Sequence, residues 1–505
     1  MSRVSKNILY NLFGQGLLLI LGFVAVKYIF RQLGEDALGI IYFTTMLNAL
    51  LSAVFGMGVS TTVVREVSAH LESEPTYIHD LLQTFSCFFW GIYVVVAVAF
   101  FLLAPVLVDK WINLKSMSEP TAVYVVRFLG ISALLAFPRS FYTSLFNGLQ
   151  RMEINNLIDV ITIALQQFGT ILILILRGNL FHVVYWFAFC YIIRIIVYFI
   201  VSSRFFSLNS LFPIFSFSVI KRTFGFASKM MSISVLSTIH VNFAKLIISK
   251  LMPIGMIGYY STAYGAISRA TLLTGAIARA AFPSFSELFQ AGDRQRMLSQ
   301  YHKLQDLLCF GVVPIFAAVP FASLPLFSYM FNVQTARLLL LPVLFLCVGF
   351  YMNGTLNVPY VFSLAVGKPG IAAWQNFYAL FVVLPVTGAL IYLLGLTGAA
   401  LAWVFYHIFA YSYGVPRMCK ECMEIPIWRW YLHVLKILLL AGLTYGVAWV
   451  ALSLIGNYSI LALAIAYIGG SVAFLTGAYF MIGEELRGTI LGHFHSLKTK
   501  LVEVT

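Results

Sequence analysis

Long apolar runs separated by short polar turns dominate the hydrophobic pattern of this 505-residue chain. A helix needs about 20 consecutive apolar residues to cross the hydrocarbon core of a bilayer, and most of the runs reach that length. The pattern therefore predicts an all-α integral membrane protein with about 14 transmembrane helices. The predicted spans cover residues 8–33, 40–64, 81–108, 122–147, 152–176, 181–203, 224–251, 255–286, 306–331, 336–363, 371–395, 398–416, 433–455 and 458–482.

Composition agrees with this class, because 61% of the residues are hydrophobic and only 10% are charged. Soluble domains carry about 25% charged residues. The first apolar run is too long for a removable signal peptide and lacks the small-residue cleavage pattern, so we expect the N-terminus to stay attached.

Basic residues outside the spans are distributed unevenly between the two sides of the membrane. Seventeen fall on one side, Arg65 and Arg417 among them, and six on the other, Arg31 and Lys110 among them. The positive-inside rule then places both termini in the cytoplasm. We expect the membrane to be the cytoplasmic (inner) membrane. The net charge of +14 is thus mostly a topology signal. Nucleic-acid binding is not indicated, since the cations are dispersed among apolar spans and form no soluble basic patch.

The chain also repeats itself at an offset of 218 to 219 residues. Lys27–Leu33 followed by Gly39 aligns with Lys245–Leu251 followed by Gly258. Leu and Gly are abundant, so chance matching is the alternative explanation. Six spans in each copy would give both copies one orientation, an arrangement known in transporters. We therefore expect two pseudo-symmetric six-helix lobes and two C-terminal helices, with boundaries at 1–210, 211–420 and, for the extra helices and a cytoplasmic tail, 421–505.

Nine basic side chains lie inside the apolar spans, whereas Asp159 is the single acid comparably placed. A cation near the bilayer centre costs roughly 2.5–3.5 kcal/mol, so such residues normally face a bundle interior or a watery cavity. A positive cavity implies an anionic passenger. Cations near span ends have the alternative of reaching the membrane surface. The candidates for a cationic, substrate-binding cavity are Arg139, Arg194, Lys229, Arg269 and Arg279.

The fifth predicted span has one polar face, on which Asn155, Asp159, Thr162 and Gln166 fall at helical spacing. An ionisable acid in lipid needs a partner or water, which favours a cavity here and makes Asp159 the candidate for ion coupling. On the second and tenth spans, helix packing is the favoured alternative. A hydrogen bond to a neighbouring helix is the favoured alternative for His240. The candidate polar lining of the cavity is Asn48, Gln166, His240, Asn353 and Asn357.

Two arginines share the eighth predicted span, with Arg269 near mid-membrane and Arg279 nearer the cytoplasm. Because the planar guanidinium binds phosphate oxygens bidentately, two of them at different depths would pass a phosphate along. Arg279 has the alternative of anchoring the helix end. Arg139 and Asp159 lie on adjacent spans at similar depth, so a structural ion pair is the alternative for both.

Several segments resemble the polysaccharide-biosynthesis (Wzx-type) flippases of the multidrug/oligosaccharidyl-lipid/polysaccharide exporter superfamily. The similar segments are Phe30–Gly39, Gly56–Val59, Val64–Glu66, Lys245–Ile248, Gly258–Tyr264, Phe282–Glu287 and Gly292–Arg294. Members of that superfamily have two six-helix lobes around a central cavity. One departure matters. An Asp commonly precedes the basic residue of the seventh helix, but Ala244 precedes Lys245 here, so no role of that acid transfers.

The resemblance implies flipping of a polyprenyl-pyrophosphate-linked oligosaccharide across the cytoplasmic membrane for cell-surface polysaccharide (O-antigen type) biosynthesis. Arg269 and Arg279 look like counterparts of the cavity arginines of such flippases. Pyrophosphate and sugars would enter a cationic cleft between the lobes while the lipid tail stays in the bilayer, and the lobes would rock to give alternating access. The chain has no phosphate-gripping Gly-x-x-x-x-Gly-Lys-Ser/Thr loop, so we expect coupling to a Na⁺ or H⁺ gradient and no other cofactor. Membrane lipid and polysaccharide assembly proteins are the further expected partners.

Two other classes of function were compared with this one. A drug/cation antiporter of the same superfamily usually has acids facing its cavity and twelve spans, whereas this chain has excess base and two further helices. A membrane glycosyltransferase or polymerase would bind the same anionic donor, with Glu35 and Asp36 as catalytic carboxylates. Their turn is only a few residues long, so we expect the pair to solvate the loop.

Two smaller features complete the pattern. Cys419 and Cys422 resemble half a zinc site, but no second Cys or His pair of suitable spacing accompanies them, so we expect no metal. The segment 284–305 reads as an interfacial linker between the halves of the second lobe.

Overall fold

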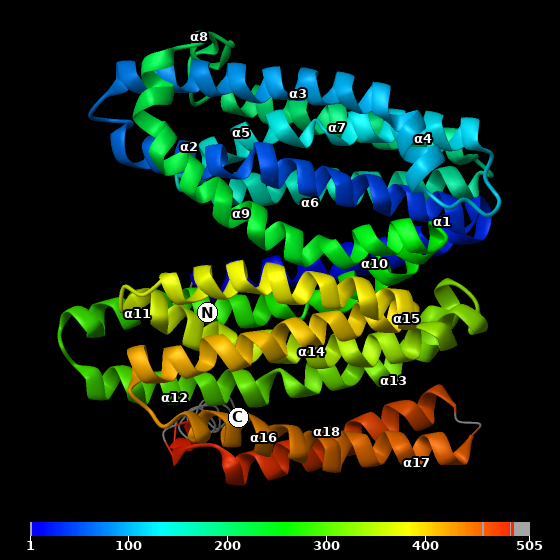
Figure 1. Ribbon diagram of the computed structural model, residues 1–505, viewed down its shortest axis with the longest axis vertical. Helices are drawn as coiled ribbons and strands as arrows, with labels where there is room; N and C mark the ends of the chain where they lie inside the picture. The colour runs from blue at the N-terminus through cyan, green and yellow to red at the C-terminus, as the bar shows by residue number, and fades with distance from the viewer. Residues whose placement is uncertain (1–2, 457–458, 485, 489–505) are drawn as a thin grey trace, which may run out of the picture. The chain divides into compact units, whose positions relative to one another are not determined.

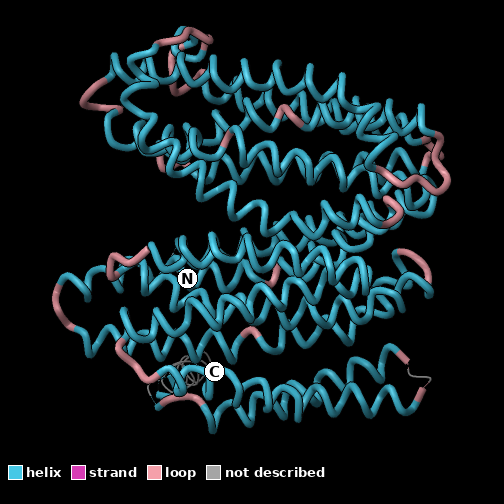
Figure 2. The backbone as a smooth tube through the Cα atoms, viewed as in Figure 1, coloured by secondary structure: helices cyan, strands magenta, loops and turns pink. Residues whose placement is uncertain are grey.

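The computed structural model describes residues 3–456, 459–484 and 486–488, with side chains from residue 16 onward except at positions 57, 229, 232, 233, 272 and 279. Every regular element in this part of the chain is a helix (Figures 1 and 2), which confirms the predicted all-α class. The chain divides into two compact units, Met1–Ser261 (unit 1) and Thr262–Thr505 (unit 2).

In unit 1 the long helix α1 packs against α4, α6 and α9, while α7 packs against α4, α5 and α6. Helix α2 lies between α5 and α9, and α3 covers α4 and α5. The helices of this unit are α1 (Arg3–Phe55), α2 (Met57–His70), α3 (Pro75–Trp111), α4 (Glu119–Ala133), α5 (Ala136–Gly148), α6 (Met152–Ile175), α7 (Leu180–Ser202), α8 (Leu208–Leu211), α9 (Phe217–Leu251) and the start of α10 (Gly255–Ser268).

In unit 2 the helix α14 is central and packs against α11, α12, α13 and α15, while α18 packs against α13 and α16. Its elements after α10 are α11 (Thr271–Gln290), α12 (Arg294–Gly311), α13 (Val313–Met330), α14 (Val333–Ala365), α15 (Gly370–Arg417), the π-helix η1 (Met418–Met423), α16 (Ile427–Ala441), the π-helix η2 (Gly442–Gly446), α17 (Val447–Ile455) and α18 (Ile460–Met481).

Ten helical stretches of the described residues are long and apolar enough to cross a membrane. Two of them, Gly16–Phe55 and Gly370–Met423, hold 40 and 54 residues, which exceeds what one crossing needs. Each contains one residue outside the helical region, Gly34 at φ 86° and Gly395 at φ 57°. Glycine adopts positive φ without steric penalty. Both glycines fall where the sequence pattern separates two successive spans, so each long helix corresponds to two predicted spans.

Two predicted spans contain a break that the pattern did not predict. The fourth span is interrupted between α4 and α5 at Leu134 and Leu135, although Glu119–Gly148 still forms one spanning stretch, and the eighth is interrupted between α10 and α11 at Arg269 and Ala270. Within the segment 284–305, helix α11 continues to Gln290 and α12 begins at Arg294. The side chain of Asp293 caps α12 by accepting from the Arg296 N–H.

Two glycines that the internal repeat aligns meet inside unit 1. An added Cβ on Gly258 would lie 3.4 Å from the backbone nitrogen of Gly39, and one on Gly39 would collide with the carbonyl of Ile254. Small residues permit such a close approach of two helices. The backbone of α1 therefore lies close to the start of α10 at these positions.

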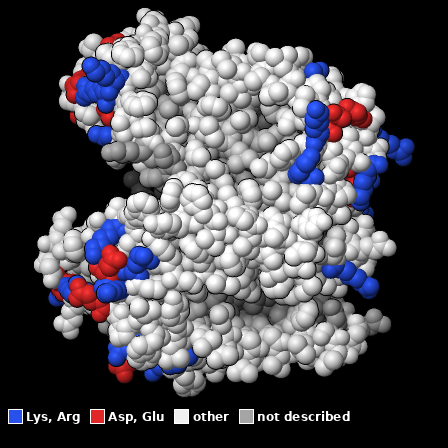
Figure 3. Space-filling view, viewed as in Figure 1, with Lys and Arg blue, Asp and Glu red and all other residues white. Residues whose placement is uncertain are grey.

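Charged side chains on the face shown in Figure 3 gather at the two ends of the helices in each unit and leave an uncharged band between. Large apolar side chains are exposed on the helices, for example Ile460, Ile465 and Ile468 of α18. Exposed apolar surface bounded by polar ends is what a bilayer requires of a spanning helix.

Candidate functional site

Helices α5, α6 and α7 of unit 1 bring three predicted charges together. Arg139 Nη1 donates to Asp159 Oδ1 at 3.0 Å, which confirms the ion pair that the sequence offered as an alternative. Arg194 of α7 lies within electrostatic reach of both partners. Arg139 lies nine residues before the last residue of α5, Asp159 lies seven residues after the first residue of α6, and Arg194 lies eight residues before the last residue of α7. At 1.5 Å per residue this is a common depth of about 10–13 Å.

Arg194 is the most enclosed member of this charged cluster of Arg139, Asp159 and Arg194. The residue is only 7% exposed, and its Nε and Nη2 atoms are buried without a hydrogen-bond partner in the part of the chain that the structure describes. A buried cation normally has a carboxylate of its own. Here two guanidiniums share one carboxylate, so the cluster carries net positive charge.

Polar groups of α6 and α7 surround the cluster. The Tyr198 hydroxyl donates to the Asn155 carbonyl at 3.4 Å, and the Gln166 side chain lies beside Tyr191. Trp186 Nε1 donates to the Gln166 carbonyl at 3.0 Å, which fixes α7 against α6. The polar stripe predicted for the fifth span therefore faces α5 and α7, and much of it serves packing.

The ion pair is not fully enclosed, since the side chains of Arg139 and Asp159 are 28% and 37% exposed. Charges exposed to hydrocarbon at this depth would be strongly unfavourable. The accessible edge of the cluster must therefore face water or polar ligand. This surface could receive an anion, or a cation that competes with Arg139 for the carboxylate.

Arg269 of unit 2 is exposed and occupies the break between α10 and α11. Non-helical backbone at membrane depth is tolerated where it is buried in protein or lines a watery cavity. The sequence treated Arg269 and Arg279 as residues of one continuous helix, and that geometry is wrong. Arg279 in α11 and Lys229 in α9 have side chains outside the described part of the structure.

The remaining predicted lining residues contact neighbouring helices. Asn48 donates to the Ala133 carbonyl at 2.8 Å, and Asn357 donates to the Thr274 hydroxyl at 2.8 Å. Both bonds join one helix to another. Asn353 is half-buried in α14, and His240 is half-buried in α9.

The carboxylates considered for a transferase have structural contacts. Asp36 is 1% exposed, and its Oδ2 accepts from the backbone N–H groups of Lys115, Ser116 and Met117 at 2.7 to 2.9 Å. Glu35 pairs with the Lys115 ammonium at 3.0 Å. The expectation that this pair solvates its loop is wrong for Asp36, which instead fixes the turn after α3.

Cys419 and Cys422 are both buried in the π-helical turn η1. No group of three or more His, Cys, Asp or Glu side chains arranged to hold a metal occurs among the described residues.

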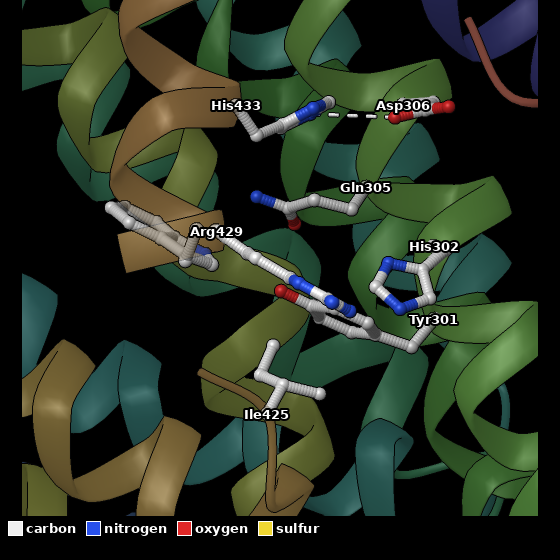
Figure 4. A pocket seen from close by; sticks show the side chains of 8 residues that line it. Tyr301, His302, Gln305, Asp306, Ile425, Arg429 and His433 are labelled. Carbon is white, nitrogen blue, oxygen red and sulfur yellow. Dashed lines mark ion pairs between the residues drawn. The ribbon is translucent and has the colours of Figure 1, made fainter. Parts of the chain in front are cut away.

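A polar cavity that the hydrophobic pattern did not predict lies in unit 2 between α12 and α16 (Figure 4). Asp306, Arg429 and His433 contribute to its wall. A signal was available, because His302, Asp306 and His433 are ionisable residues near the ends of predicted apolar runs. His302 and Asp306 share one face of α12 at i, i+4 spacing, but nothing in the sequence joined them to His433, which lies on a helix far away in the chain.

Comparisons with known proteins agree on one family and one fold. A family model described as polysaccharide biosynthesis protein matches residues 4–289, which is more than half of the chain. A putative O-antigen transporter of Shigella flexneri is 22% identical over 412 residues, covering 79% of this chain and 94% of that protein.

Two solved structures share the fold. The lipid II flippase MurJ in an inward closed conformation has a TM-score of 0.70 at 15% identity, covering 94% of this chain and 98% of that chain. An inward-facing multidrug resistance MATE family transporter of the MOP superfamily has a TM-score of 0.63 at 12% identity, covering 80% and 95%. With the family match over residues 4–289, these findings show that the chain belongs to the polysaccharide biosynthesis protein family.

Proposed function

We propose that this protein is a flippase that moves a polyprenyl-pyrophosphate-linked oligosaccharide across the cytoplasmic membrane for cell-surface polysaccharide biosynthesis. Membership of the polysaccharide biosynthesis family and the similarity to an O-antigen transporter support the class of passenger. The fold shared with a lipid II flippase and a MATE transporter supports transport as the mode of action.

The observation that carries the proposal is the excess of positive charge at Arg194. A guanidinium that is 7% exposed, with two nitrogens lacking hydrogen bonds, costs folding free energy. Ionisable residues inside membrane spans usually have a function, and for a buried cation that function is commonly the binding of an anion. A pyrophosphate offers planar arrangements of oxygens that match the donor fork of arginine.

For the mechanism, we propose alternating access of a cationic passage to the two sides of the membrane. Arg139, Arg194, Lys229, Arg269 and Arg279 would supply its charge, with both termini in the cytoplasm. Asp159 would couple the cycle to ions. Protonation of this carboxylate, or Na⁺ binding to it, would release Arg139 toward the passenger, and loss of the ion would restore the pair.

Reconstitution tests the class of function. Purified protein in sealed liposomes should move a fluorescent lipid-linked oligosaccharide from one leaflet to the other, measured by loss of accessibility to an impermeant quencher. Chemical conversion of the sugar donor in detergent solution would instead assign the protein to the transferases.

A variant tests the cationic passage. Arg269→Ala should insert normally yet fail to restore surface polysaccharide in a deletion strain. Arg296→Ala is the matched control, because the Arg296 side chain is 81% exposed and pairs only with Asp293 of its own helix. Full complementation by Arg269→Ala would remove that residue from the passage.

A further inference from the structure

The cavity between α12 and α16 in unit 2 has the features of a built polar site (Figure 4). Its volume is about 230 Å³, enough for a small polar group. We call it the α12–α16 pocket. Its wall is formed by Tyr301, Gln305 and Asp306 of α12 and by Arg429, Trp430 and His433 of α16.

Several polar atoms of this wall have no hydrogen-bond partner. Among the described residues they are Tyr301 Oη, Gln305 Oε1 and Trp430 Nε1, whereas His433 Nε2 lies 3.4 Å from Asp306 Oδ1. Tyr301, Gln305 and Trp430 are only 1%, 3% and 3% exposed. The Trp430 indole lies beside the Tyr301 hydroxyl, but neither atom has a bond of ordinary geometry. Buried polar atoms are normally paired, so three unpaired atoms behind one cavity make the wall of that cavity unusually polar.

The charge of the pocket favours an anion. In Figure 4 the Arg429 side chain extends across the cavity toward Tyr301, and His302 points in from the side. Asp306 is partly neutralised, because its Oδ2 accepts from the Gly483 N–H at 2.8 Å and its Oδ1 lies 3.4 Å from His433 Nε2.

A second, larger cavity of about 560 Å³ adjoins the pocket and shares Arg429 and His433 with it. We call it the adjoining groove. Phe310, Trp428, Leu432, Phe480 and Met481 give the groove an apolar wall, and Lys436 adds a second fixed cation. Asp306 is the one carboxylate among the described residues that line either cavity.

Both cavities lie at the charged end of unit 2. Arg429 is the third residue of α16, Met481 is the last residue of α18, and Arg294 of α12 pairs with Glu424 at 3.0 Å just before α16. Basic pockets between membrane helices at this level suit phospholipid head groups. A small polar pocket, a pair of cations at its border and an apolar groove beyond them follow the order of groups in a phospholipid.

We propose that the α12–α16 pocket and the adjoining groove bind one anionic glycerophospholipid with a hydroxyl-bearing head group, of the phosphatidylglycerol type. The phosphodiester lies at the border, between Arg429 and Lys436. The head-group hydroxyls enter the polar pocket beside Arg429. One acyl chain follows the apolar wall of the groove. This site is separate from the charged cluster of unit 1 and does not depend on the proposed transport function.

Native mass spectrometry of delipidated protein in detergent tests the proposal. When the three lipids are added back, the wild type should bind one phosphatidylglycerol in preference to phosphatidylethanolamine or phosphatidylcholine. Because hydrogen bonds to charged groups contribute roughly 1.5–3 kcal/mol, Arg429→Gln should weaken that binding about tenfold or more. Arg429 is exposed, so the variant should fold. Arg296→Gln, at an exposed arginine outside both cavities, is the matched control and should bind as the wild type does.

Competition identifies the source of the anion. Excess inorganic phosphate should leave the bound lipid in place, since it cannot use the apolar groove. Displacement by inorganic phosphate would show a free-anion site, and displacement by a polyprenyl phosphate would show a substrate site. Either result overturns the proposal, as would equal binding of the three phospholipids or unchanged binding by Arg429→Gln and by Arg429→Gln/Lys436→Gln. Neither competitor experiment depends on transport activity.

Discussion

The charged cluster of unit 1 and the α12–α16 pocket of unit 2 both combine arginine with one carboxylate, yet they differ in how the carboxylate is held. Asp159 bonds directly to Arg139 and serves two guanidiniums, one of them 7% exposed. Asp306 faces a histidine and a backbone N–H, while the arginine of its pocket, Arg429, is exposed. The first site holds its excess charge on a buried guanidinium, whereas the arginine of the second is accessible from outside the protein.

This difference shows why counting cations is not enough to find a passage. Among the basic residues inside predicted spans, Arg139 already forms an ion pair with Asp159. Removing Arg139 would leave the Asp159 carboxylate without that partner. Within the charged cluster, Arg194 is the residue without a hydrogen-bonded carboxylate among the described residues. The predictions below separate these roles.

The largest effect should come from Arg194→Gln. Loss of a charge-assisted contact to the passenger should reduce surface polysaccharide about tenfold or more in a complementation assay. The midpoint of thermal unfolding in detergent should not fall, because the variant removes a buried charge that lacks its own partner.

Arg194→Lys is the control, because it keeps the positive charge but lacks the planar guanidinium with its paired donors. It should restore only part of the activity, since a lysine cannot bind phosphate oxygens bidentately. A lower melting temperature with normal polysaccharide export in Arg194→Gln would make the residue structural.

The two carboxylates should differ when each is made neutral. Asp159→Asn leaves two guanidiniums without an anion and should destabilise unit 1 by roughly 1–3 kcal/mol. Asp306→Asn should cost less than about 1 kcal/mol, because its amide oxygen still accepts from the Gly483 N–H. Melting temperatures of the two variants, measured in one detergent, check this order.

The double variant Arg139→Gln/Asp159→Asn separates a structural role of this ion pair from ion coupling by Asp159. A purely structural pair should regain both stability and export when both charges are removed. If Asp159 couples ions, stability should recover while export stays low. Recovery of export in the double variant would exclude the coupling role.

Helix spacing at the cluster predicts a smaller, steric effect. A Cβ on Gly169 of α6 would collide with the Trp186 indole of α7, so Gly169→Ala should cost about 1–3 kcal/mol and move Asp159 away from Arg194. Gly91→Ala is the control, since nothing lies within 4 Å of its added Cβ. Equal melting temperatures for the two variants would contradict this packing.

The smallest effect concerns an exposed pair between α9 and the start of α3. Arg222 donates to both Glu74 oxygens at 2.7 and 3.0 Å, and this bond lowers the pKa of Glu74 below its usual 4.5. A lowered folded-state pKa gives stability that is present above pH 4.5 and is lost as the pH falls below it. In Arg222→Gln the melting temperature should therefore change slightly less with pH in the acid range than it does in the wild type. If the melting temperature depends on pH in the same way in both proteins, the pair contributes nothing to stability.

Hydrophobic length was sufficient to predict the helical class and most spans, because a bilayer admits few alternatives to apolar helices. Gly34 and Gly395 also stand where the pattern placed turns. The breaks at Leu134 and at Arg269 were not predicted, since apolar residues continue through both and only packing against other helices decides where a helix bends. The Arg139–Asp159 pair was accessible as one of two alternatives, because their depths could be read from the sequence.

Sequence alone determined that this is a helical membrane protein rich in cations inside its spans and a member of its family, because periodicity, charge and family motifs are properties of the chain itself. Which cation keeps its charge, and that Asp306, Arg429 and His433 share a pocket, were decided only in the tertiary structure. Pairing depends on distances between helices that are remote in the sequence, and the free energy of a buried charge is set by neighbours that no local pattern specifies.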